Sequence, residues 1–126
     1  MRSCLIVDAD ESARASVVDA VRAASKGLRE FHEAVDAEGA LRIFEAEKPD
    51  VVFLDVTHLG LLHAMLAARP TVHVVLVTGS TGVQPSMVDA ISLGAIAALR
   101  KPVREEEVKF VLESIDPEKA RRDYFS

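Results

Sequence analysis

The sequence predicts a single α/β domain in which helices cover both faces of a parallel β-sheet. Short apolar runs rich in Val, Ile and Leu alternate with amphipathic stretches. Because these runs are apolar at successive positions, they are typical of strands that are buried on both faces. Strict alternation of strands and helices implies right-handed βαβ units and therefore parallel strands. A chain of 126 residues suits one domain with its own core.

Five segments are expected to form the strands. Three are strongly apolar, at Cys4–Val7, Val51–Leu54 and Val72–Val77. Two are weaker, at Leu28–Ala34 and Ala95–Leu99. Five βα units leave two common outcomes, a flavodoxin-like sheet or a small Rossmann-like sheet, and periodicity alone does not choose between them.

Between the strands, small and apolar residues recur at helical spacing and predict five helices that face the core. The groups are Ala13, Val17, Val21 and Ala24, then Ala37, Ala40, Leu41 and Phe44, then Leu62, Met65 and Leu66, then Val88, Ile91 and Ser92, and finally Val108, Val111, Leu112 and Ile115. Asp36 is placed to cap the second helix, and Gly94 is placed to stop the fourth.

Composition argues against several functional classes. The formal net charge is −5, so the domain as a whole does not suit nucleic acid or an anionic membrane surface. No apolar run approaches the roughly 20 residues that span a bilayer, and the first residues do not resemble a signal peptide. Cys4 is the single cysteine, and its apolar surroundings indicate a small buried hydrophobe. We therefore expect a cytoplasmic protein.

Polar side chains follow four of the predicted strands, at the point where each strand ends. They are Asp8, Asp10 and Glu11 after the first strand, Asp55 after the third, Thr78, Gly79 and Ser80 after the fourth, and Lys101 after the fifth. In an open α/β sheet, ligands bind outside these strand ends. The sequence therefore predicts one site that combines carboxylates, a hydroxyl group and an ammonium group.

This combination suits the transfer of a phosphoryl group to a side chain. Clustered carboxylates favour Mg²⁺, which takes hard oxygen ligands. Asp55 can act as the nucleophile and form an aspartyl phosphate. Lys101 and Thr78 can hold phosphoryl oxygens, and Gly79 leaves room for the group. Asp10 is a weaker metal ligand candidate, because its position also suits the cap of the first helix.

The ordered set of motifs resembles the receiver domain of bacterial response regulators over about residues 3–115. The matching segments are Leu5-Ile6-Val7-Asp8 with Arg14 downstream, Pro49-Asp50-Val51-Val52-Phe53-Leu54-Asp55, Val75-Leu76-Val77-Thr78-Gly79, Gly94-Ala95 and Leu99-Arg100-Lys101-Pro102. The resemblance implies a flavodoxin-like (βα)5 sheet with strand order 2-1-3-4-5. It suggests a receiver domain at residues 1–115, with residues 116–126 as a C-terminal tail or the start of a linker.

The resemblance also implies a function. A sensor histidine kinase or a histidine phosphotransfer protein would donate a phosphoryl group to Asp55. Mg²⁺ would be bound by Asp8, Asp55 and the backbone carbonyl of Thr57, while Thr78 and Lys101 would bind phosphoryl oxygens. A surface near the fourth and fifth helices would then signal to an output domain or a protein partner. We expect a phosphoacceptor rather than an enzyme. The sequence leaves open whether the chain forms a homodimer.

Two positions and one segment depart from the family pattern. Ala9 stands where the family has a second acid after the first strand, so we expect Mg²⁺ binding to be weakened or absent. The segment after Asp55, residues 56–60, lacks the usual Pro and is shortened. Ala98 stands where the family often has Tyr or Phe, so an aromatic switch cannot operate at that position.

These departures leave two functions open. The first is a phosphorylatable receiver with altered metal affinity and output coupling. The second is a pseudo-receiver, a protein–protein interaction module that acts without phosphorylation. A small α/β hydrolase or phosphatase fits poorly, because no second Asp follows Asp55 closely enough to act as acid and base. His58 could contact phosphate or a metal, but an exposed loop histidine is the simpler interpretation.

Overall fold

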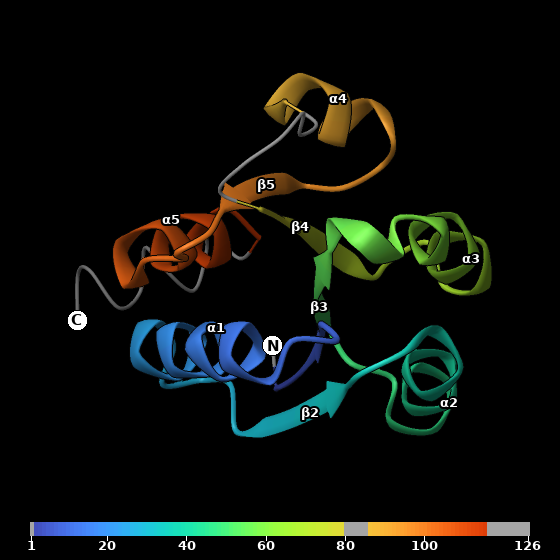
Figure 1. The fold of residues 1–126 in the computed structure, drawn as a ribbon, viewed down its shortest axis with the longest axis horizontal. Coiled ribbons are helices and arrows are strands. Elements are labelled where there is room, and N and C mark those ends of the chain that lie inside the picture. Colours follow the sequence, from blue (N-terminus) through green and yellow to red (C-terminus); the bar gives the residue numbers. More distant parts are fainter. Residues whose placement is uncertain (1, 80–85, 116–126) are drawn as a thin grey trace.

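A computed structural model describes residues 2–79 and 86–115 of the chain. Five strands form one parallel sheet in the order β2-β1-β3-β4-β5 (Figure 1). The strands are β1 (Ser3–Val7), β2 (Glu30–Ala34), β3 (Val51–Asp55), β4 (His73–Thr78) and β5 (Ala97–Arg100). The flavodoxin-like strand order is confirmed, and the Rossmann-like alternative is excluded.

Helices alternate with the strands and cover both faces of the sheet. They are α1 (Glu11–Ala24), α2 (Ala37–Glu47), the 3-10 helix η1 (Val56–His58), α3 (Gly60–Ala68), α4 (Met87–Ser92) and α5 (Glu105–Ile115). Figure 1 shows α1 and α5 on one face and α2 and α3 on the other, with α4 beside β5. None of the helices within the described ranges is long and apolar enough to cross a membrane. Ser80 and the tail at 116–126 lie outside the described residues.

Short polar residues and glycine set several helix ends. Asp10 caps α1, because its side chain accepts a hydrogen bond from the Ala13 N–H at 3.0 Å. Asp36 caps α2 in the same way, as predicted. Gly94 follows α4 with a φ of +103°, a conformation that L side chains rarely adopt. A Cβ at this position would also lie 2.5 Å from a terminal methyl carbon of Leu66, so that side chain would have to shift as well.

The sheet separates two apolar layers. The layer under α1 and α5 includes Val17, Val21, Val108, Val111 and Leu112. The layer under α2 and α3 includes Ala40, Phe44, Leu62 and Met65. β1 and β3 are buried along their whole length, and β4 is buried after its first residue. This burial on both faces is what their continuous apolar runs predict, and it fixes the strand ends that carry the polar residues.

Expectations about three of the weaker elements are wrong. Val88 is 72% exposed and Ile91 is 56% exposed, so they do not form the buried face of α4. Ala90 is fully buried instead, because this six-residue helix turns its small residue toward the sheet. The fifth strand begins at Ala97 rather than at Ala95, and the second begins at Glu30 rather than at Leu28. As an edge strand it pairs with β1 alone, and only Ala34 within it is buried.

Candidate functional site

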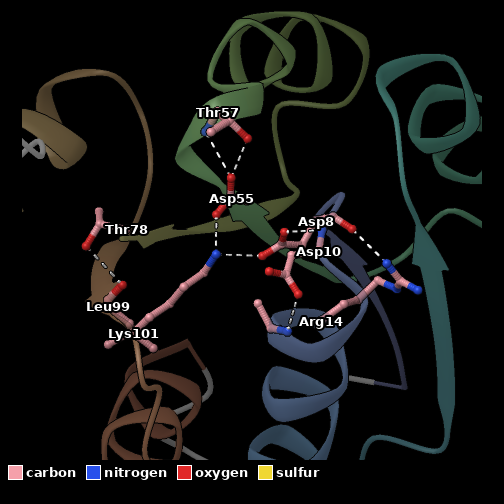
Figure 2. A network of polar contacts seen from close by, with 9 residues as sticks. Asp8, Asp10, Arg14, Asp55, Thr57, Thr78, Leu99 and Lys101 are labelled. Carbon is pink, nitrogen blue, oxygen red and sulfur yellow. Dashed lines mark hydrogen bonds and ion pairs between the residues drawn. The ribbon is translucent and has the colours of Figure 1, made fainter. Parts of the chain in front are cut away.

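Lys101 bridges two carboxylates at the C-terminal edge of the sheet (Figure 2). Its Nζ atom lies 2.8 Å from Asp8 Oδ2 and 2.7 Å from Asp55 Oδ1. Asp8 follows β1, Asp55 ends β3 and Lys101 follows β5, so the sheet joins residues up to 93 positions apart. The two acids are only 4% and 6% exposed. The structure thus brings together three of the side chains that the sequence placed at the strand ends.

The second carboxylate oxygen of Asp55 also has donors. Asp55 Oδ2 accepts a hydrogen bond from the Thr57 N–H at 3.1 Å and another from the Thr57 hydroxyl group. These bonds fold the chain directly into η1, where Asp55 is the N-cap. Sequence reasoning considered only the carbonyl of Thr57 and missed its hydroxyl. The Asp-x-Thr pattern was the available signal, because Asp commonly accepts from the backbone two residues later.

These contacts determine the charge state of the site. Burial raises the pKa of Asp55, but hydrogen bonds from Lys101 and Thr57 outweigh burial and hold the pKa below its ordinary 3.8. Burial lowers the pKa of Lys101, but hydrogen bonds to Asp55 and Asp8 raise it above its ordinary 10.5. At neutral pH the site therefore contains an ionised carboxylate on Asp55 beside an ammonium group.

Asp8 is fixed from three directions. Its Oδ1 accepts from the Asp10 N–H at 2.9 Å, while its Oδ2 accepts from Lys101. Its backbone carbonyl accepts from Arg14 Nη1 at 2.9 Å. Arg14 also donates through Nε to Glu33 Oε1 at 2.9 Å, which connects α1 to β2. Arg14 therefore holds the turn that contains exposed Ala9, a role that the motif match alone did not specify.

Thr78 and Gly79 lie at the end of β4, beside this network. Thr78 is 4% exposed, and its hydroxyl donates to the Leu99 carbonyl on β5 at a long 3.4 Å (Figure 2). Gly79 follows directly and is partly buried. The Asp10 carboxylate caps α1, as described above. The Lys101-Pro102 peptide bond is cis.

The surroundings of His58 and Cys4 test two further predictions from the sequence. His58 lies in η1 and is partly buried, so its interpretation as an exposed loop residue is wrong. Its Nε2 atom is shielded from solvent and has no hydrogen-bond partner among the described residues. Cys4 is fully buried in β1, and burial raises the pKa of its thiol to about 12. A thiol with that pKa stays protonated, so Cys4 acts as a small hydrophobe.

The paired acids suit a hard divalent cation. Asp8 Oδ2 and Asp55 Oδ1 already converge on a single positively charged atom, Lys101 Nζ. Mg²⁺ is commonly bound through one or two carboxylates and keeps several of its waters. Two convergent carboxylates therefore fit the ion, although Ala9 contributes no third.

Comparison with known protein families matches residues 4–113 to the response regulator receiver domain. The chain belongs to this family. The match includes every residue of the charged network described above, and receiver domains are signalling domains that generally bind Mg²⁺ in their acidic pocket. A comparison with curated proteins finds no match.

Solved structures with the same fold include other receiver domains. The receiver domain of AraT, a response regulator from Geobacillus stearothermophilus, has a TM-score of 0.76 at 22% identity, covering 96% of this chain and 97% of that one. A CheY-like receiver domain protein from Methanospirillum hungatei JF-1 has a TM-score of 0.76 at 24% identity, covering 96% and 98%. NtrX from Brucella abortus, in complex with ATP, has a TM-score of 0.79 at 28% identity. That match covers 97% of this receiver domain but 28% of the NtrX chain.

Proposed function

We propose that this receiver domain accepts a phosphoryl group on Asp55 from a histidine kinase or a histidine phosphotransfer protein. The observation that carries the proposal is the bridge from Lys101 to Asp8 and Asp55. It combines an ionised nucleophile with a positive charge that is already positioned beside it. The fixed geometry means that little reorganisation is needed when a phosphoryl donor arrives.

The transfer exchanges one bond to phosphorus for another. A carboxylate oxygen of Asp55 bonds to phosphorus, and the bond from phosphorus to the donor's histidine nitrogen breaks. The electron pair of the broken bond stays on that nitrogen, which takes up a proton. Lys101 then pairs with a phosphoryl oxygen, and the Thr78 hydroxyl exchanges its long bond to Leu99 for another such oxygen. Gly79 leaves space beside the group.

Asp8, Asp55 and the backbone carbonyl of Thr57 would hold Mg²⁺, with Asp10 as a further candidate ligand. The ion supplies positive charge to the phosphoryl oxygens when it is bound. Ala9 removes one carboxylate from this set, and Lys101 competes for the two that remain. We therefore expect weak Mg²⁺ binding, or none before the phosphoryl group itself contributes oxygen ligands.

Signalling is assigned to the surface near α4 and α5, which carries the exposed apolar residues Val88, Ile91 and Phe110. Its partner is an output domain or a separate protein, and a homodimer is a third arrangement. We place the receiver domain at residues 1–115 and a tail or linker at 116–126. The NtrX match supports an attached output domain, because the matched part is a fraction of a longer chain. The role is that of a cytoplasmic phosphoacceptor without an activity on other substrates.

The test is phosphorylation of the full chain with acetyl phosphate, with and without Mg²⁺, read as intact mass. Asp55→Asn removes the nucleophile, and Asp19→Asn, on the exposed face of α1, is the matched control. We expect one phosphoryl adduct on the parent protein and on Asp19→Asn, and none on Asp55→Asn. An adduct that survives in Asp55→Asn contradicts the assignment. If a phosphorylated phosphotransfer protein also fails to label the folded chain, the pseudo-receiver function replaces this one.

A further inference from the structure

A second group of metal-binding side chains lies between β2 and α2. Glu30 and His32 belong to β2, and Glu47 is the last residue of α2. One potential ligand atom from each lies within 4.8 Å of the others. Across residues 2–79 and 86–115, this is the one set of three or more His, Cys, Asp or Glu side chains close enough to share an ion. It contains none of the residues of the Asp55 site.

Strand periodicity explains why two of these side chains point the same way. Glu30, His32 and Ala34 alternate along β2, so they share one face of the strand. Ala34 packs in the apolar layer with Phe44, which shows that this face looks toward α2. α2 ends above it at Glu47, because Lys48 adopts a left-handed conformation with a φ of 48°.

His32 contributes a second observation, because one of its ring nitrogens is left without a hydrogen bond. Its Nε2 atom is shielded from solvent and has no hydrogen-bond partner among the described residues. The nearest charged atom, Glu47 Oε2, is 3.9 Å away, which is too long for a hydrogen bond. An imidazole nitrogen left without a partner is costly when water cannot reach it. An ion between His32 and Glu47 would satisfy both atoms.

The ligand types select the class of ion. Mg²⁺ and Ca²⁺ prefer oxygen ligands alone, whereas an imidazole nitrogen suits Zn²⁺ and related transition metals. Bond lengths of about 2.0–2.2 Å place neighbouring ligands of a tetrahedral ion roughly 3.3–3.6 Å apart. The separation of 3.9 Å between His32 and Glu47 therefore needs only a small contraction. The glutamates can supply it, because their side chains are 47% and 49% exposed and free to change rotamer.

Arg2 competes with a bound metal ion for Glu30. Arg2 Nε lies 3.7 Å from Glu30 Oε1, but the Arg2 side chain is 80% exposed. Such exposed ion pairs contribute little and break easily. A divalent ion held by two carboxylates and an imidazole would displace this arginine.

We propose that Glu30, His32 and Glu47 form a binding site for Zn²⁺ or a similar divalent transition-metal ion. The protein supplies three of the four ligands of a tetrahedral ion, and a water molecule supplies the fourth. The ion joins the edge strand β2 to the C-terminal end of α2. This site does not depend on phosphorylation of Asp55 and stands whether or not that proposal holds.

The experiment uses the full chain without an affinity tag. Zn²⁺ binding is measured by calorimetry, and Co²⁺ is added separately to record the visible absorption of a tetrahedral site. His32→Gln and Glu47→Gln each remove one ligand, and His63→Gln, exposed on α3, is the matched control. We expect one Zn²⁺ per chain, about tenfold or greater loss of affinity in both ligand variants, and no change in His63→Gln. Circular dichroism establishes that each variant is folded.

Asp55→Asn separates this site from the acidic pocket. Zinc affinity that is unchanged in Asp55→Asn and reduced in His32→Gln supports the proposal. Equal zinc affinity in the parent protein and His32→Gln overturns it. The proposal is also overturned if the parent protein does not bind zinc. It is overturned as well if Asp55→Asn loses zinc binding while His32→Gln retains it.

Discussion

At the C-terminal edge of the sheet charged side chains are buried, whereas on α4 apolar side chains are exposed. Asp8 and Asp55 are nearly inaccessible, and Lys101 satisfies both. Val88 and Ile91, which are typical core residues, are more than half exposed. The two regions invert the usual relation between polarity and burial.

The difference indicates where side chains are held in place by several partners and where they are not. The charged network is held by three strand ends, so a change at one residue leaves a buried group unsatisfied. Val88 and Ile91 on α4 are apolar and exposed, so a change at either leaves no buried polar group unsatisfied. We infer that the charged network tolerates few changes, whereas the exposed surface of α4 can vary more freely.

The largest expected effect comes from the layer beneath the charged network. Phe53 is fully buried in β3, two residues before Asp55. Phe53→Ala should lower the free energy of unfolding by about 3–5 kcal/mol, because it leaves a cavity in the strand that carries Asp55. Urea denaturation measures this change. A loss no larger than that of Ile91→Ala would remove the contrast between the two regions.

The next effect concerns Lys101. Lys101→Met should cost about 1–3 kcal/mol, because two buried carboxylates lose their charged hydrogen-bond donor. The same variant should bind Mg²⁺ more tightly than the parent protein, since the ammonium group no longer competes for Asp8 and Asp55. Urea denaturation and Mg²⁺ titration report the two quantities, with Lys109→Met on the exposed face of α5 as control. Unchanged Mg²⁺ affinity would show that Lys101 and the ion do not compete.

Acid should weaken the charged network through Asp55. Its pKa is lower in the folded state than its ordinary 3.8, so the unfolded chain binds the proton first. The stabilisation is therefore complete above pH 3.8 and is lost as the pH falls through the folded pKa. Stability measured from about pH 7 down to about pH 2 should fall less steeply in Asp55→Asn. Parallel curves for the two proteins would mean that the network does not stabilise the ionised form.

The smallest expected effect lies on α4. Ile91→Ser should change the free energy of unfolding by less than about 0.5 kcal/mol, because the side chain is already 56% exposed. Phosphorylation of Asp55 by acetyl phosphate should also be unchanged. Urea denaturation and intact mass test both statements. A loss above about 1 kcal/mol would show that α4 packs more closely than its exposure indicates.

Much of the fold was predictable from the sequence, and the exceptions lie in elements that bury little apolar surface. β1, β3 and β4 are central strands, so both faces had to be apolar and their runs were unmistakable. β2 is an edge strand with mixed polarity, and its start was placed two residues too early. α4 is short, and among its residues 88–92, whose burial is described, Ala90 is the one that faces the core, so the exposed Val88 and Ile91 misled the periodicity argument.

For the candidate site, the sequence predicted which residues meet but not how they contact one another. Strand ends placed Asp8, Asp55 and Lys101 at one edge, because parallel strands share a direction. The pattern could not predict which atoms bond, since those contacts depend on side-chain rotamers. The Thr57 hydroxyl on Asp55 and the Arg14 bridge to Glu33 belong to this class. The Glu30 and His32 alternation was visible in the sequence, but Glu47 joins them only through the packing of α2.

The strand order has a consequence for synthesis of the chain. β1 is made first, yet it lies between β2 and β3 in the finished sheet. On a ribosome, β1 emerges with both of its hydrogen-bonding edges open, and β2 can cover only one of them. The other edge stays unpaired until residues 51–55 have also left the exit tunnel. The nascent domain therefore passes through an interval in which its most apolar strand has an open edge and is vulnerable to wrong pairing.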